Sequence, residues 1–102
     1  MQIIPIQAVE NQAITVTLAG QPCQINVYQK LYGLFVDLYV SDALIVSGTP
    51  ALNVTRIVRS DYLGFVGDLI FIDTQGFDDP AYDGLGFRFH LAYLEASELI
   101  AA

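Results

Sequence analysis

The densest group of potential metal ligands in this sequence is a set of four aspartates, Asp73, Asp78, Asp79 and Asp83. Calcium takes about six to eight oxygen ligands from carboxylates and carbonyls, so such a set could form part of a calcium site. The spacing does not match an EF-hand loop, because Phe77 stands where a ligand belongs and no glutamate closes the set. Aspartate next to proline or glycine is also typical of turns, where its side chain bonds the local backbone. We therefore expect a structural or interaction loop without a bound metal.

Catalytic chemistry has few candidates in the chain. His90 is the only histidine and stands beside Arg88, whereas general acid–base catalysis needs a partnered histidine in a cleft. The sequence contains no nucleophile-elbow motif and no histidine–glutamate metal motif. Cys23 is the only cysteine, and it shares a predicted strand face with Ile25 and Val27, which favours a buried, unreactive thiol. The sequence therefore predicts no enzyme, no catalytic residue and no cofactor.

Two arginines, Arg56 and Arg59, stand close together in a chain that has few cations. They can be exposed charges near an edge strand, where each contributes little to stability. They can also pair with acidic residues of a neighbouring subunit, in which case they are interface residues. Both interpretations stay open.

The overall negative charge argues against polyanionic partners. The 102 residues include 4 Lys and Arg against 11 Asp and Glu, which gives a formal net charge of −7. Nucleic acids and anionic membranes attract clustered cations, so neither is an expected partner. No run of about eighteen apolar residues is present, so no transmembrane helix is expected. Charged residues make up only 15% of the chain, below the typical value of about 25%. Either other subunits cover part of the surface, which we favour, or the protein is an unusually apolar monomer.

The elements that would position these residues are strands, because apolar and polar residues alternate with period two along most of the chain. Pro5 favours an edge or a strand start for the first of them. Residues 47–50 and 75–86 break the pattern, and only 95–102 resembles a short helical tail. The predicted strands span about residues 4–8, 13–18, 23–28, 34–40, 43–46, 53–58, 68–74 and 87–94.

Seven or eight short strands separated by turns indicate one all-β domain over residues 1–102. We expect a small antiparallel β-barrel or sandwich with a short C-terminal helical tail at 95–102. Two glycines also predict an ordered turn before the strand at 68–74, since positive φ angles suit glycine. The residues in or beside this turn are Leu63, Gly64, Phe65, Val66 and Gly67.

The segment 75–86 carries Phe77, Tyr82 and Leu85 among acidic residues. A loop of about twelve residues is uncommon in a compact domain unless it binds something. Aromatic residues are enriched at the energetic centres of interfaces, so we expect these side chains to contact a neighbouring chain, with Phe77 and Tyr82 as the anchors. The alternative is that the loop folds back and its rings cover the open end of their own domain.

Several stretches of the sequence together resemble one family of phage proteins. They are MQIIPIQAV at the start, CQINVYQK with GLFVDLYV, SDYLGFVGDLIFIDTQG followed by DDPAYDGLG, and LAYLEASEL near the end. The combined pattern runs over about residues 1–99 and resembles the phage baseplate plug family, small tail proteins of contractile-tailed phages and their cyanophage relatives.

The resemblance implies a non-enzymatic virion protein of the tail baseplate, made in the cytoplasm of the bacterial host. Such a plug would pack with hub, spike and tube-end proteins at the end of the tail tube. It would be a homo-oligomer, and the tail axis makes three- or sixfold symmetry natural. The family carries over no catalytic residue. The alternative from the residues themselves is a small β-barrel module that binds calcium or sugar through the 75–86 loop.

Overall fold

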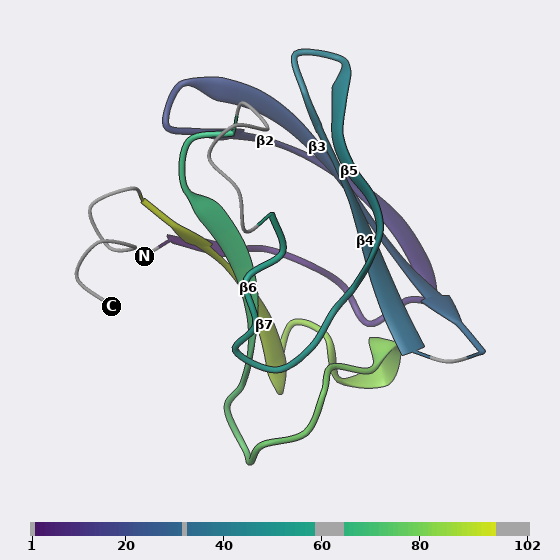
Figure 1. The fold of residues 1–102 in the computed structure, drawn as a ribbon. Helices are drawn as coiled ribbons and strands as arrows, with labels where there is room; N and C mark the ends of the chain where they lie inside the picture. The colour runs from purple at the N-terminus through teal and green to yellow at the C-terminus, as the bar shows by residue number, and fades with distance from the viewer. Residues whose placement is uncertain (1, 32, 59–64, 96–102) are drawn as a thin grey trace.

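The computed structural model describes residues 2–31, 33–58 and 65–95, and strands dominate this part of the chain (Figure 1). Its seven strands form two separate antiparallel sheets, ordered β2–β3–β4–β5 and β1–β7–β6. The sheets face each other across a shared apolar core, so the all-β prediction is confirmed and the sandwich alternative fits. The barrel alternative does not, because the sheets are not closed on each other. The strands are β1 (Gln2–Ile4), β2 (Asn11–Leu18), β3 (Gln21–Lys30), β4 (Gly33–Val40), β5 (Ala43–Pro50), β6 (Asp68–Asp73) and β7 (Phe89–Leu94).

The four-stranded sheet is a meander of hairpins whose register follows the alternation in the sequence. Ala19 and Gly20 make the two-residue turn between β2 and β3, with positive φ angles of 50° and 76°. Ser41 and Asp42 make the turn between β4 and β5 in the same way, with φ angles of 50° and 66°. Turns of this hand match the natural twist of the flanking strands. The strands predicted over 13–18 and 23–28 are confirmed, and they pair with each other as a hairpin.

The structure corrects the predicted ends of two strands. β5 does not stop at Val46 but continues to Pro50, because a bulge-like register shift and a φ of 65° at Gly48 let the ladder continue. β1 ends at Ile4 instead of running on to residue 8. Pro5 has no N–H to donate, so it cannot extend the ladder.

The strand predicted over 53–58 does not form. The segment makes one isolated bridge, between Asn53 and Phe71, and then follows the outer edge of β6. The N–H of Val54 donates to the Phe71 carbonyl at 2.8 Å, and the N–H of Ile57 donates to a β6 carbonyl at 2.9 Å. Val54 has a φ of 52°, which interrupts the extended backbone. We call residues 53–58 the strap, because they cover the edge of β6.

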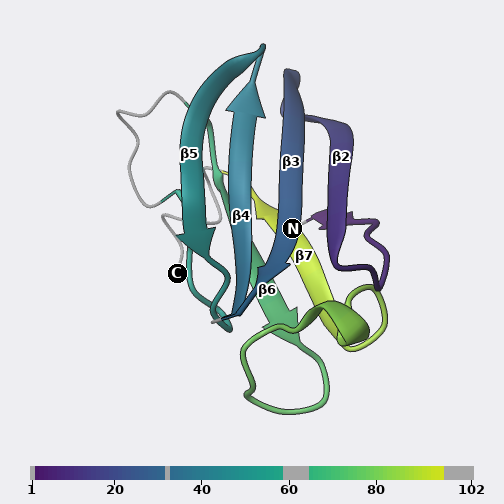
Figure 2. The same ribbon diagram turned by 90° about the vertical axis from the view of Figure 1, so that its right-hand side faces the viewer.

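The core lies between the sheets, and β6 is buried along nearly its whole length. In the view of Figure 2 the four-stranded sheet lies in front, and β6 and β7 cross behind it at an angle. Cys23 is 2% exposed, and burial raises the pKa of its thiol, so the buried-thiol prediction is confirmed. The largest fully buried side chains include Tyr93, Phe71, Ile4, Leu18, Ile25 and Leu38.

Some predictions fall on residues that the structure does not describe. They concern Arg59, Leu63, Gly64 and the tail over 96–102. Glu95, the last described residue, belongs to no helix, so the helical tail is not supported. Gly67 has a φ of 93°, the positive value that the predicted turn requires. Within the described ranges, no helix has the length and apolarity needed to cross a membrane.

Candidate interaction site at one end of the sandwich

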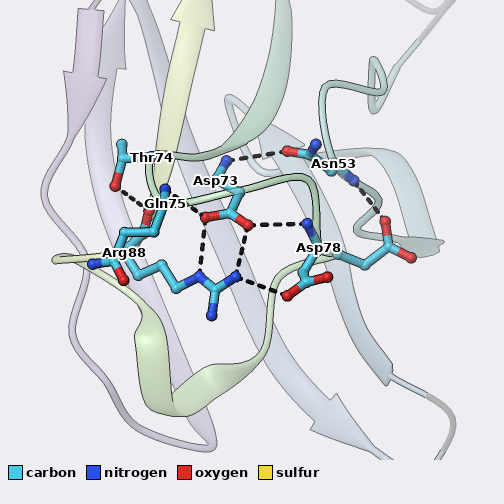
Figure 3. A network of polar contacts seen from close by, with 7 residues as sticks. Asn53, Asp73, Thr74, Gln75, Asp78 and Arg88 are labelled. Carbon is cyan, nitrogen blue, oxygen red and sulfur yellow. Dashed lines mark hydrogen bonds and ion pairs between the residues drawn. The ribbon is translucent and has the colours of Figure 1, made fainter.

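A partly buried ion pair holds the base of the loop between β6 and β7 (Figure 3). Asp73 is the last residue of β6, and Arg88 directly precedes β7. The guanidinium donates from Nε to Oδ1 at 3.0 Å and from Nη2 to Oδ2 at 2.9 Å. Two parallel bonds of this kind fix orientation as well as distance. The Asp73 side chain is fully buried and the Arg88 side chain is 30% exposed, so the loop closes on a charge pair at the rim of the core.

The surroundings of Asp73 favour its ionised form. Hydrogen bonds from Arg88, and from the N–H groups of Gln75 and Asp78, hold the pKa of the Asp73 carboxyl well below its ordinary value of 3.8. They outweigh burial, which acts to raise that pKa. The hydrogen bond to Asp73 in turn raises the pKa of the Arg88 guanidinium. Both N–H bonds are 2.9 Å long, so the carboxylate organises the first residues of the loop.

Further hydrogen bonds connect the loop to Arg88 and to the strap. Asp78 Oδ2 accepts from Arg88 Nη2 at 2.8 Å. Asp79 Oδ1 accepts the N–H of Asn53 at 2.9 Å, and Asn53 Oδ1 accepts the N–H of Asp73 at 3.0 Å. Three of the four aspartates that suggested a calcium site therefore bond groups of their own chain (Figure 3).

The second half of the loop folds onto the core. Tyr82–Gly84 form the short 3₁₀ helix η2, and the N–H of Tyr82 donates to Gln29 Oε1 of β3 at 3.3 Å. The Tyr82 ring is half-buried against the core, so only part of it remains accessible. Leu85 is 1% exposed and belongs to the core itself. The prediction of Leu85 as an interface residue is therefore wrong, because its side chain is already buried by its own chain.

Phe77 behaves differently, since its side chain is 94% exposed although the loop around it is fixed. Leu31 is 88% exposed, and Val54 and Phe87 are 62% exposed each; together these are the four most exposed large apolar residues of the described chain. All four lie where β3, β5 and β6 end and β4 and β7 begin, at one end of the sandwich (Figure 1). We call this set the apolar tip. Large exposed apolar side chains at one end of a domain make that end a candidate interaction site.

Arg56 finds its acidic partner within its own chain. Its Nε donates to Oδ2 of Asp68 at 3.0 Å, and the Asp68 side chain is fully buried while that of Arg56 is 43% exposed. The ion pair that we considered with a neighbouring subunit is thus made inside the protein. Arg59, the other arginine of that prediction, lies outside the described residues.

The sequence did not reveal three residues of the apolar tip, Leu31, Val54 and Phe87. The alternation places Phe87 on the inner face of the last strand, but β7 begins only at Phe89. A tight turn precedes it, in which the N–H of Arg88 donates to the Gly84 carbonyl at 2.9 Å. The glycines around this turn are the signal that could have moved the strand start. Leu31 follows β3 directly, and nothing in its neighbours distinguishes it from a buried turn residue.

Within the described residues, the candidate metal ligands and His90 have the following surroundings. No group of three or more His, Cys, Asp or Glu side chains is placed there to hold a metal ion. His90 is half-buried within β7. The Asp73 carboxylate already accepts bonds from a guanidinium and two N–H groups. This end presents to solvent the Phe77 ring on its hydrogen-bonded loop, and also the exposed side chains of Leu31, Val54 and Phe87.

The described residues thus form a β-sandwich with large exposed apolar side chains at one end. Residues 1–96 match the model of the family described as cyanophage baseplate Pam3 plug gp18. Because the match covers nearly the whole chain, the protein belongs to this phage baseplate plug family, and the resemblance seen in the sequence is confirmed. The family places the protein in the phage virion, as a structural component of the tail baseplate that associates with other baseplate proteins. No curated protein sequence matches the chain.

Proposed function

We propose that this protein is a non-enzymatic plug subunit that docks through its apolar tip onto the hub, spike and tube-end proteins of a contractile tail. The observation that carries the proposal is Phe77, 94% exposed on a loop whose base is held by the pair of Asp73 and Arg88. A ring held in this way binds at low entropic cost, because the loop is ordered before contact. Aromatic side chains are also the commonest energetic anchors of interfaces.

The charges near Phe77 indicate the chemistry of the partner surface. Asp78 follows Phe77 directly, and its side chain is 76% exposed. Asp79 and Asp83 of the same loop are exposed as well. Interfaces commonly combine an apolar centre with a polar rim. We expect a partner pocket of apolar residues bordered by lysine or arginine, so that raising the salt concentration slows association.

Several copies around the tail axis would each present the same tip. We expect three- or sixfold symmetry, in which every copy makes an equivalent contact with one neighbour of the surrounding ring. The work of such a plug is shape-complementary packing. It needs no catalytic group.

Co-purification with the hub and spike proteins of the same phage tests this function. Replacement Phe77→Ser should weaken binding about tenfold or more, since truncation of an anchoring aromatic commonly costs about 2 kcal/mol. It should leave the melting temperature nearly unchanged, because the ring is exposed in the isolated protein. Leu44→Ser is the matched control, since Leu44 is 53% exposed at the opposite end of the sandwich. Undiminished binding by Phe77→Ser, or equal loss by both variants, would show that the apolar tip is not the docking site.

A further inference from the structure

In the described part of the chain, three of the four sheet edges are protected against the addition of another strand. Proteins blunt such edges by shortness, proline, bulges, charges or a covering segment, because an unpaired edge is a template for pairing. β1 has 3 residues and is followed by Pro5. β5 is irregular in register and ends at Pro50. The strap covers β6 with backbone hydrogen bonds.

From Ala13 onward, β2 carries none of these protections. It has 8 residues, pairs with β3 in unbroken register, and contains no charge, proline or glycine in its sequence NQAITVTL. In the described part of the chain no strand pairs with its outer edge, and Figure 2 shows it at the border of the four-stranded sheet. None of the 11 acidic residues lies in it. β2 is thus a long, regular and uncharged edge in an acidic protein.

We propose that β2 joins two copies of this chain edge to edge, antiparallel, around a twofold axis at Val16. The first residues of β2 are already accompanied by the preceding segment. The Gln12 side chain exchanges two hydrogen bonds with the backbone of Gln7, at 3.0 and 2.7 Å. The stretch open to a second copy is therefore Ala13–Leu18, and Val16 lies near its middle.

The backbone geometry supports this register. In an antiparallel ladder, hydrogen-bonded and non-bonded pairs alternate, and a two-residue turn is closed by a bonded pair, here Leu18 with Gln21. By this alternation the N–H and C=O groups of Thr15 and Thr17 point away from β3. With the axis at Val16, Thr15 faces Thr17 of the second copy. The outward-pointing backbone groups of the two edges therefore meet each other.

The side chains are self-complementary in the same register. On the inner face, Val16 stands opposite Val16 of the second copy and Ile14 stands opposite Leu18. Val16 and Ile14 are half-buried in the single chain, so pairing extends the apolar core across the axis. On the outer face threonine meets threonine, a favourable cross-strand pair. No like charges face each other, which explains how a chain with a net charge of −7 can pair with itself here.

This pairing goes beyond the proposed docking function and does not depend on it. The apolar tip lies at one end of the sandwich, whereas β2 lies along its side (Figures 1 and 2). A ring around the tail axis uses two different surfaces of each copy, but the β2 pair uses one surface twice. We therefore expect the β2 pair in the isolated protein, where it covers the free edge of β2 in the absence of baseplate partners.

Size-exclusion chromatography with light scattering tests the pairing on the isolated full chain at micromolar concentration. We expect twice the mass of one chain, which is 11.2 kDa. Thr15→Pro should give the single mass, because the N–H it removes points away from β3 and the hairpin keeps its bonds. Thr15→Val keeps the backbone intact and should stay paired. A monomeric natural protein, or a Thr15→Pro variant that still pairs, overturns the proposal.

Disulfide crosslinking tests the register even where Thr15→Pro fails to fold. Val16 is paired with Cys23 across the hairpin, so the experiment needs a Cys23→Ala background. In that background Val16→Cys places two thiols opposite each other at the axis, and mild oxidation should link the two chains. Ile14→Cys faces a leucine and should remain unlinked. Any other pattern of linkage overturns the proposal.

Discussion

The two ends of β6 carry the same pair of residue types and use them in different ways. Asp68 begins the strand and Asp73 ends it; both side chains are fully buried, and each forms an ion pair with an arginine. At Asp68, Oδ2 accepts from the arginine while Oδ1 accepts three backbone N–H groups. These N–H groups, at 3.1, 2.8 and 2.7 Å, belong to Ile57, Val58 and Leu69.

At Asp73 the two carboxylate oxygens accept equal numbers of hydrogen bonds. Each accepts one nitrogen of Arg88 and one N–H of the loop. Asp68 therefore acts mainly as a backbone acceptor that fixes the strap within the core. Asp73 acts mainly as the partner of a guanidinium that fixes the loop carrying Phe77. The Asp68 carboxylate stabilises the fold, whereas the Asp73 carboxylate fixes the loop that carries the proposed docking residue Phe77.

The largest effect is expected at Asp68. Asp68→Ala leaves three buried N–H groups without their acceptor, and such a loss should lower the free energy of unfolding by about 3–5 kcal/mol. Asp68→Asn keeps one oxygen for those N–H groups, so it should cost less than half as much. Urea unfolding of the two variants measures the difference. An asparagine variant as unstable as the alanine variant would mean that the charge on Asp68, and not its acceptor geometry, is what matters.

A substitution of Gly67, next to Asp68, should lower the stability more than a substitution of Gly76, in the loop held by Asp73. Gly67 has a φ of 93°, and a Cβ there would overlap the Leu94 carbonyl oxygen and the Tyr93 ring. Gly67→Ala should therefore cost about 2–4 kcal/mol, and Gly67→Val more. At Gly76 a Cβ would lie 3.4 Å from Asp73 Oδ2, an ordinary contact, so Gly76→Ala is the matched control. Equal stability of the two alanine variants, again by urea unfolding, would contradict the close packing at the Asp68 end.

The sequence predicted the strands whose position follows from the residue pattern of their own segment. Period-two alternation identified residues 13–18, 23–28 and 34–40 as strands, and their register follows it. The alternation wrongly predicted a strand at the strap. Residues 53–58 are apolar enough for a strand, but they are held by hydrogen bonds from one side only. A pattern of residue types cannot show whether a segment joins a ladder or only covers its edge.

The candidate site was predictable only in part. Phe77 was identified because a large ring in an acidic loop is unusual, and the structure leaves it exposed. Leu85 was assigned to the interface on the same argument, although it fills the core. Both residues belong to one loop, whose base is held by the pairing of Asp73 with Arg88, 15 residues apart. Long-range ion pairs of this kind leave no periodic signal.

At Asp73 we expect asparagine and alanine to be equally damaging. Each carboxylate oxygen bonds the guanidinium, so the amide of Asp73→Asn would turn N–H donors toward Arg88. Both variants should melt several degrees below the natural protein, and limited proteolysis should cut within residues 74–81. Asp83→Asn removes an exposed charge from the same loop and should leave melting and cleavage unchanged. A protease-resistant loop in Asp73→Asn would show that the remaining contacts hold Phe77 in place without the ion pair.

The smallest effect is a difference in pH dependence between the natural protein and Asp73→Asn. The pKa of Asp73 in the folded protein lies well below its ordinary value of 3.8, so the unfolded chain binds its proton more readily. The stability that Asp73 contributes is therefore complete above about pH 5 and declines as the pH falls toward the lowered pKa. The melting temperatures of the two proteins should differ by a constant amount between about pH 5 and pH 8, and the difference should begin to shrink below about pH 4 and decrease further toward the lowered pKa. Asp83→Asn, measured in parallel, should follow the natural protein. A difference that persists unchanged at about pH 2 would mean that Asp73 stabilises the loop through its shape and not through its charge.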